Sequence, residues 1–160
     1  MTHENETQIR IVKIKEGTVI DHISAGRALD VLQILGITGK EGSVVSIGMN
    51  ISSSRIATKD IVKIEDRHLK DSEVDKIALV APDATINTIR DYKVEKKTRV
   101  VLPHTITNVI ECPNPRCVTN KEREPIEAKY EVVSDHPIKL KCNYCWTLID
   151  EKDIILQFAG

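Results

Sequence analysis

Aromatic side chains are scarce in this 160-residue chain, where they make up 3% of the sequence. Four of the five lie beyond residue 129, namely Tyr130, Tyr144, Trp146 and Phe158. The core before that point must therefore be built from Ile, Val, Leu and Ala. Because Ile and Val are β-branched and favour strands, the composition predicts a strand-rich first part with an aliphatic core.

The chain also lacks a net charge of either sign and any long hydrophobic run. Lys and Arg total 23 against 24 Asp and Glu, which gives a formal net charge of -1. A nearly neutral chain has no general attraction for nucleic acid. No apolar run approaches the roughly 20 residues that cross a bilayer, and the polar N-terminus does not resemble a secretory signal. We therefore expect a cytoplasmic protein that binds neither nucleic acid nor a membrane.

All four cysteines lie in the last third of the chain, as two short pairs. Four residues separate Cys112 from Cys117, and two separate Cys142 from Cys145. Such spacing is typical of Zn²⁺ sites, because one turn brings two thiolates to the same ion. Four protein ligands leave no position for a reactive water, so the predicted zinc is structural. Two alternatives stay open: a pair of disulfides, which a reducing compartment disfavours, and a redox pair at the second turn.

Periodicity in the first hundred residues predicts an α+β fold. The expected strands are 8–15 with 18–20, 44–51, 60–65, 84–90 and 92–97. Helices are expected after Ser24, with a buried stripe at Ala25, Ala28, Leu29, Leu32 and Leu35, and from Asp71 to Pro82. This order is that of a ferredoxin-like βαββαβ domain with an extra hairpin strand. A linker at 99–109 would join it to a small all-β zinc-binding domain.

Outside the cysteines, the residues form no recognisable catalytic arrangement. The pair Asp21 and His22 at a strand end is suggestive, but the residues alone favour a solvated turn with a capping Asp. Lys63, and Lys97 within a basic run, are typical of solvated strand faces. His136 and the other remote histidines have no partner at a telling spacing. The residues by themselves indicate a regulator or an adaptor rather than an enzyme.

Several stretches, in matching order, resemble the regulatory chain of aspartate carbamoyltransferase. They are 17–23 (GTVIDHI), 59–65 (KDIVKIE), 81–89 (APDATINTI) and the cysteine pairs. The resemblance implies a non-catalytic subunit in which residues 1–100 bind nucleotide effectors and residues 101–160 hold zinc and dock on the catalytic chain. It also implies homodimers that join catalytic trimers into a dodecamer. ATP would activate, while CTP, alone or with UTP, would inhibit and so control pyrimidine biosynthesis.

The resemblance assigns an effector pocket position by position. Lys97 and His22 would meet phosphates, and Asp21 and Lys63 would hold ribose hydroxyls or a nearby phosphate. Base and sugar would be lined by Asn87, Tyr92 and the backbones of Ile14, Val19, Ile89 and Val94. A second, metal-bridged nucleotide would be served by Lys59, Ser53 and the tail near His3.

Two other functions fit parts of the sequence. A zinc-ribbon adaptor for nucleic acid would share the cysteines, but it should present a basic, aromatic surface. Residues 121–131 instead mix Lys and Arg with Glu. A thiol redox enzyme would use Cys142 and Cys145 for exchange and would hold no tightly bound metal.

Overall fold

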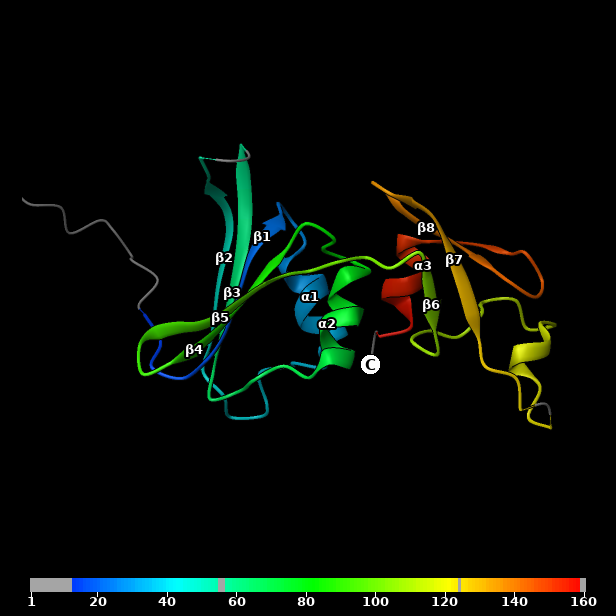
Figure 1. The fold of residues 1–160 in the computed structure, drawn as a ribbon, viewed down its shortest axis with the longest axis horizontal. Helices are drawn as coiled ribbons and strands as arrows, with labels where there is room; N and C mark the ends of the chain where they lie inside the picture. The colour runs from blue at the N-terminus through cyan, green and yellow to red at the C-terminus, as the bar shows by residue number, and fades with distance from the viewer. Residues whose placement is uncertain (1–12, 55–56, 124, 159–160) are drawn as a thin grey trace, which may run out of the picture.

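Two antiparallel sheets organise the chain in the computed structural model, which describes residues 13–54, 57–123 and 125–158. The first sheet has five strands in the order β2-β3-β1-β4-β5, and the second has four in the order β6-β7-β8-β9. Helices α1 and α2 lie on the side of the first sheet that faces the second domain (Figure 1). Within the described residues, no helix is long and apolar enough to cross a membrane.

The first domain contains β1 (Gly17–Ser24), α1 (Ala28–Ile34), β2 (Val45–Ser52), β3 (Thr58–Glu65), α2 (Asp71–Ala78), β4 (Thr85–Arg90) and β5 (Lys93–Arg99). This order confirms the predicted ferredoxin-like βαββαβ domain with one extra hairpin strand. Asp91 and Tyr92 have φ values of 49° and 64°, as a two-residue hairpin turn requires. Of the predicted strand 8–15, residues 8–12 lie outside the described residues and 13–15 are not in a strand.

The middle strand β1 pairs with both β3 and β4. Alternate side chains of a strand lie on opposite faces, and Ile20, Val62 and Ile86 belong to the core cluster that also includes residues of α1 and α2. The predicted helical stripe is wrong at Ala25, which is exposed in the turn before the helix, and at Leu29, which is 58% exposed. The helix begins at Ala28, and the next residue lies about 100° around its axis, away from the buried face.

The side chain that caps the turn before α1 is Asp60 of β3 and not Ser24, which the sequence pattern favours; Ser24 contributes only its backbone carbonyl, which accepts from the Arg27 N–H at 3.1 Å. The Asp60 side chain is fully buried, and its Oδ2 accepts hydrogen bonds from the backbone N–H of Gly26 at 2.9 Å and Ala28 at 3.0 Å. Its Oδ1 accepts one from the N–H of Asn50 at 2.8 Å. A buried carboxylate is tolerated when donors of this kind satisfy it. One side chain of β3 therefore fixes two other backbone segments, the turn before α1 and Asn50 in β2.

The second domain contains β6 (Thr105–Thr107), η1 (Val118–Asn120), β7 (Lys129–Asp135), β8 (Ile138–Cys142), β9 (Leu148–Asp150) and α3 (Glu151–Leu156). Strand β6 lies inside the predicted linker and pairs with β7, so its hydrogen bonds come from a partner that the local sequence does not reveal. Helix α3 adds to the predicted all-β domain. Asp150 caps it by accepting a hydrogen bond from the Asp153 N–H at 2.9 Å.

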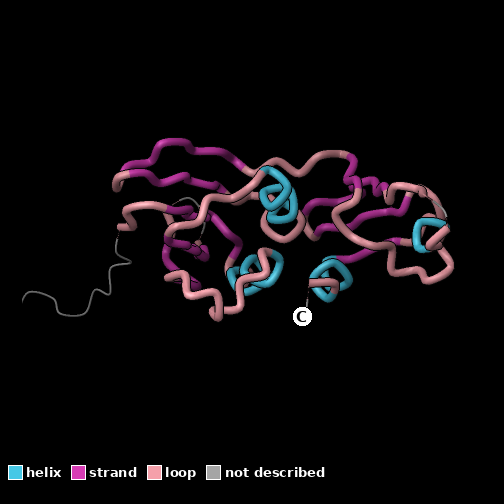
Figure 2. The backbone as a smooth tube through the Cα atoms, turned by 90° about the horizontal axis from the view of Figure 1, so that it is seen from below, coloured by secondary structure: helices cyan, strands magenta, loops and turns pink. Residues whose placement is uncertain are grey.

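The two domains meet through α3. It lies beside α1, between the first domain and the second sheet (Figures 1 and 2). Buried residues of both domains form one apolar cluster. Two ion pairs cross the junction: Arg27 to Glu151, with N···O at 2.5 Å, and His136 to Asp83, with N···O at 2.7 Å. His136 therefore has a partner that its sequence neighbourhood did not suggest.

The buried Asp60 gives a first testable prediction. Asp60→Ala leaves three backbone N–H groups without their acceptor, so the free energy of unfolding should fall by roughly 3 kcal/mol or more. Asp75→Ala, at an exposed position of α2, is the matched control and should change it by about 0.5 kcal/mol or less. Urea unfolding followed by circular dichroism measures both. An equal effect of the two variants would show that the Asp60 carboxylate does not hold the fold.

Candidate functional site

The four cysteines converge on one point of the second domain. Their Sγ atoms all lie within 4.8 Å of one another. The distance is 3.6 Å between Cys112 and Cys145 and 3.7 Å between Cys117 and Cys142. Thiolates at the usual ~2.3 Å from a tetrahedral zinc lie roughly 3.8 Å apart. The cluster thus has the dimensions of a structural zinc site, as the spacing predicted, and the two turns do not act as separate pairs.

The surroundings of the sulfur atoms suit a metal. Burial raises the pKa of Cys112 and Cys142, although backbone N–H groups partly oppose this. Burial also opposes ionisation of Cys145, but its hydrogen bonds to Thr147 prevail and lower its pKa to about 6. The Thr119 hydroxyl donates to the Sγ of Cys117 at 3.1 Å. A bound zinc ion would supply the positive charge that keeps all four thiols ionised.

The loop before Cys112 is fixed by side chains that the sequence analysis did not single out. The Tyr130 hydroxyl, fully buried, donates to the carbonyl of Ile110 at 2.9 Å. The Gln157 amide pairs with both backbone groups of Glu111, at 2.7 and 2.6 Å. Tyr130 alternates with polar neighbours in β7, which is a detectable signal for a core residue, whereas nothing local indicates the role of Gln157.

A second constellation lies on the face of the first sheet opposite α1 and α2, which we call the outer face. The register places Lys63 of β3 beside Val19 of β1, Val19 beside Asn87 of β4, and Asn87 beside Lys97 of β5. Directly paired residues share one face of a sheet. Four residues that the resemblance assigned to an effector pocket therefore form one row across four strands.

Charged groups extend this row at the end of β1. Lys59 Nζ lies 2.8 Å from the Asp21 carboxylate. Burial opposes ionisation of Asp21, but its contacts with Lys59 outweigh this and hold its pKa below the ordinary value. Burial lowers the pKa of Lys63, and the charge of Asp21 partly offsets the effect. The β1 strand bulges here, and His22 adopts a φ of 56°. Asp21 and His22 are therefore not the solvated turn that the residues alone allowed.

The remaining predicted residues divide into two groups. Ile14 and Ile89 are buried with Val19 in a small apolar cluster, separate from the main core. Tyr92 and Val94, near the end of the β4–β5 hairpin, are more than half exposed. Tyr92 also donates its backbone N–H to the carbonyl of Lys15, which ties the hairpin to the segment before β1.

For the predicted second nucleotide, only two of the three elements can be placed. Lys59 is in β3 and contacts Asp21, and Ser53 follows β2. His3 and the N-terminal tail lie outside the described residues.

The fold and the cysteine cluster define a two-domain protein whose second domain is built around a structural metal site. Comparison with protein families specifies it further. Residues 9–101 match the allosteric domain of the aspartate carbamoyltransferase regulatory chain, and residues 104–155 match its metal-binding domain. The chain belongs to the family of aspartate carbamoyltransferase regulatory chains. It is therefore a non-catalytic, regulatory subunit of an enzyme of pyrimidine biosynthesis.

Similar proteins carry the same description over their full length. The chain is 53% identical to the aspartate carbamoyltransferase regulatory chain of Hyperthermus butylicus, covering 98% of each chain. It is 55% identical to that of Thermofilum pendens, over 97% of this chain and 98% of the relative. The regulatory chain of Korarchaeum cryptofilum is 49% identical over 96% of this chain and 98% of the relative.

The cysteine cluster gives a second prediction. Cys112→Ser, or a strong chelator, should remove about one zinc ion per chain and unfold the second domain, because little else closes its long loops. Metal analysis measures the ion, and amide hydrogen exchange should show β7 and β8 losing protection while α2 keeps it. Asn143→Ala, at an exposed position between two ligands, is the control and should keep the metal. A folded, protected β7–β8 pair without metal would contradict the structural role.

Proposed function

We propose that the outer face of the first domain binds the nucleotides CTP, UTP and ATP, and that their binding controls the catalytic trimers through the second domain. The cross-strand row is the observation that carries the proposal. It places cationic Lys63 and Lys97 on either side of Val19 and Asn87, with the Asp21 carboxylate nearby. This combination of charge, hydroxyl acceptor and apolar surface suits a phosphate, a ribose and a base.

Each part of a nucleotide has a chemically matching group. Lys97 is exposed on β5 and can meet a flexible triphosphate as a point charge. The ionised Asp21 carboxylate can accept hydrogen bonds from ribose hydroxyls. The apolar cluster of Ile14, Val19 and Ile89 offers a surface for the base. Backbone N–H and C=O groups of the same segments can separate an amino-bearing base edge from a keto-bearing one, because donors and acceptors exchange places.

His22 supplies independent support for a ligand at this place. Among the described residues, its Nδ1 atom is buried and has no hydrogen-bond partner. A buried polar atom that stays unsatisfied costs free energy. A phosphate or hydroxyl oxygen of a nucleotide would remove this cost, which agrees with the role that the resemblance implies for His22.

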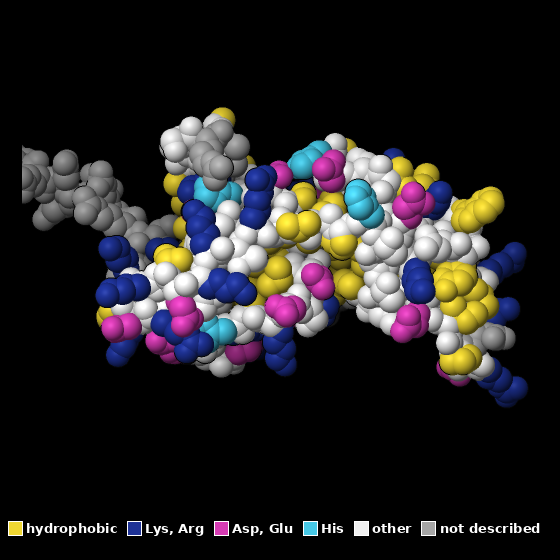
Figure 3. All heavy atoms as spheres, viewed as in Figure 1, with side chains coloured by type: hydrophobic (Ala, Val, Ile, Leu, Met, Phe, Trp, Pro, Cys, Tyr) yellow, Lys and Arg dark blue, Asp and Glu magenta, His cyan; other side chains and the backbone are white. Residues whose placement is uncertain are grey.

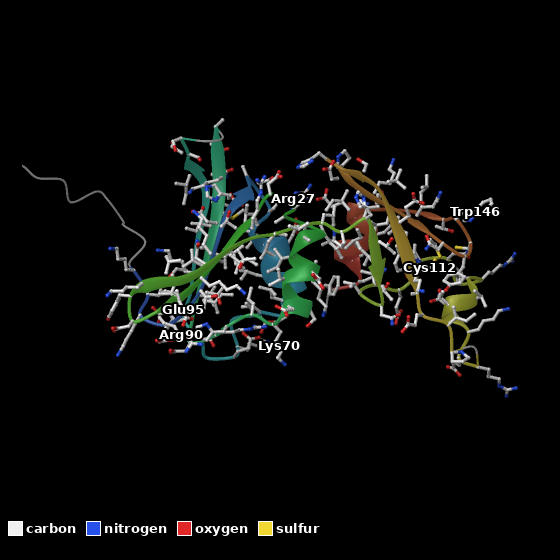
Figure 4. All side chains as sticks on the ribbon, in the orientation of Figure 1. Arg27, Lys70, Arg90, Glu95, Cys112 and Trp146 are labelled. Atoms are coloured by element: carbon white, nitrogen blue, oxygen red, sulfur yellow. The ribbon has the colours of Figure 1, made fainter. Side chains whose placement is uncertain are left out.

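The second domain offers a surface for the catalytic chain. Three large hydrophobic residues cluster in sequence at the second cysteine turn and are exposed: Trp146 by 74%, Leu148 by 55% and Tyr144 by 43%. Hydrophobic side chains are visible at this end of the molecule, and Trp146 projects from it (Figures 3 and 4). Because exposed aromatic residues are typical anchors of protein interfaces, we propose that this knuckle docks on the catalytic chain.

The proposed assembly is cytoplasmic, with homodimers formed through the first domain that bridge catalytic trimers into a dodecamer. Control requires that a nucleotide interact differently with two states of the assembly. A coupling free energy of about 1–3 kcal/mol between the nucleotide and the substrate changes the affinity for substrate. The change is several-fold at the lower end of this range and about a hundredfold at the upper end. Purine and pyrimidine nucleotides would occupy one pocket, spread it differently and so shift the equilibrium in opposite directions.

Nucleotide binding is tested by comparing two neighbouring lysines. Lys97→Ala should weaken CTP and ATP binding about tenfold, or roughly 1.4 kcal/mol, because it removes a phosphate contact. Lys96→Ala is the matched control, since Lys96 pairs with Thr88 and lies on the opposite side of β5. Isothermal calorimetry of the full chain gives both affinities. Unchanged affinity in Lys97→Ala would remove this residue from the site, and a wild-type chain that binds neither nucleotide would refute the function.

Docking is tested with catalytic trimers from the same organism. Light scattering should show the isolated chain as a dimer and the mixture as a dodecamer whose activity responds to nucleotides. Trp146→Ala should weaken assembly at least tenfold because it removes an aromatic anchor. Val101→Ala changes a residue with nearly the same exposure, 73%, outside the knuckle and should assemble normally. Normal assembly of Trp146→Ala would place the interface elsewhere.

A further inference from the structure

The junction between the domains contains a polar connection that starts at the outer face. Lys59 and Asp60 are neighbours in β3, so their side chains lie on opposite faces of the sheet. Lys59 pairs with Asp21, next to His22. Asp60 is buried on the helix side and holds the backbone on both sides of Arg27. A displacement of β3 at this point therefore moves the start of α1.

Arg27 carries the connection across the junction. Its guanidinium contacts Asp30 within α1 at 3.3 Å and Glu151 of the second domain at 2.5 Å. The Arg27 side chain is 35% exposed and that of Glu151 is 19% exposed, so solvent screens the pair only in part. Figure 4 shows Arg27 on the side of the first domain that faces the second.

Packing around this pair is incomplete. A cleft of about 320 Å³ lies between α1 and α3, and Arg27 and Glu151 both line it, together with Ile155 and Leu156. Because of the cleft, α1 and α3 make fewer apolar contacts with each other. The Arg27–Glu151 ion pair is therefore a larger share of the contact between these two helices. This geometry favours a hinge at which the Arg27–Glu151 pair is the charged contact between α1 and α3, in addition to the His136–Asp83 pair elsewhere in the junction.

Glu151 is close in sequence to the metal site. It is the first residue of α3 and follows β9, and β9 follows the turn that holds Cys145. Thr147, which contacts the Cys145 sulfur at 3.2 Å, lies just before β9. The backbone that the ion pair reaches thus leads directly to the exposed knuckle around Trp146.

We propose that the hydrogen bonds of Asp60 to the backbone beside Arg27, together with the Arg27–Glu151 ion pair, couple the outer face to the second domain, and that Arg27 is a positioning residue for the regulatory response. The proposal rests on the proposed nucleotide site and specifies how its occupation is communicated. The proposed route runs through α1 and α3 rather than along the chain segment 99–109 that joins the domains.

The test measures amide hydrogen exchange of the full chain with and without saturating CTP. In the wild type, CTP should change exchange in β9 and α3 at least threefold. Arg27→Gln should keep CTP affinity within about threefold, yet lose this change. Arg90→Gln is the matched control, because it breaks an ion pair with Glu95 on the β4–β5 hairpin, away from the second domain (Figure 4). Its response in α3 should equal that of the wild type.

Charge reversal separates communication from a purely structural effect. Arg27→Glu and Glu151→Arg should each lose the response, and the double variant should recover it because the pair is restored with opposite polarity. A wild-type response in Arg27→Gln, or a wild type that binds CTP without any change in β9 and α3, would overturn this proposal alone. Absence of CTP binding to the wild type would instead overturn the nucleotide site itself.

Discussion

Antiparallel pairing of β1 with both β3 and β4 is the constraint on which the allosteric domain depends. One register relation places Lys63 beside Val19, and the next two extend the row to Asn87 and Lys97. A slip of one residue would exchange the two faces of a strand. Aliphatic side chains such as Ile20, buried against the helices, make that exchange unfavourable because it would expose the core. The polar face is thus specified by the apolar face behind it.

The second domain depends on its metal site rather than on a large apolar core. Its four-stranded sheet has short outer strands and a long irregular loop between β6 and β7, which leaves a limited core. Four converging sulfur atoms allow one zinc ion to tie this loop, through Cys112 and Cys117, to the β8–β9 turn that holds Cys142 and Cys145. The turn that supplies Cys142 and Cys145 also presents Tyr144 and Trp146 to solvent. A rigid metal knuckle therefore carries the most exposed aromatic surface of the described chain.

The junction between the two domains combines apolar packing with charged contacts. A shared apolar cluster holds the domains together, while the pairs of Arg27 with Glu151 and His136 with Asp83 bridge them by charge. Apolar packing resists separation but has little directional preference. An ion pair adds a preferred geometry, because its energy depends on the positions of two groups. Both properties are needed for the proposed coupling, in which the domains stay joined and change their relative position.

Local sequence patterns determined α2, the β4–β5 hairpin and the metal ligands, because capping signals, alternation and short cysteine spacings act over a few residues. A binding role for the polar residues at the end of β1 comes from the resemblance, because the residues alone favour a solvated turn there. Only the tertiary structure decided β6, the capping role of Asp60 and the contact of Arg27 with Glu151. Asp60 and Ala28 are 32 residues apart, and Arg27 and Glu151 are 124 apart. Hydrogen bonds and ion pairs depend on distance in space, and the packing of sheets and helices sets that distance, whatever the separation along the chain.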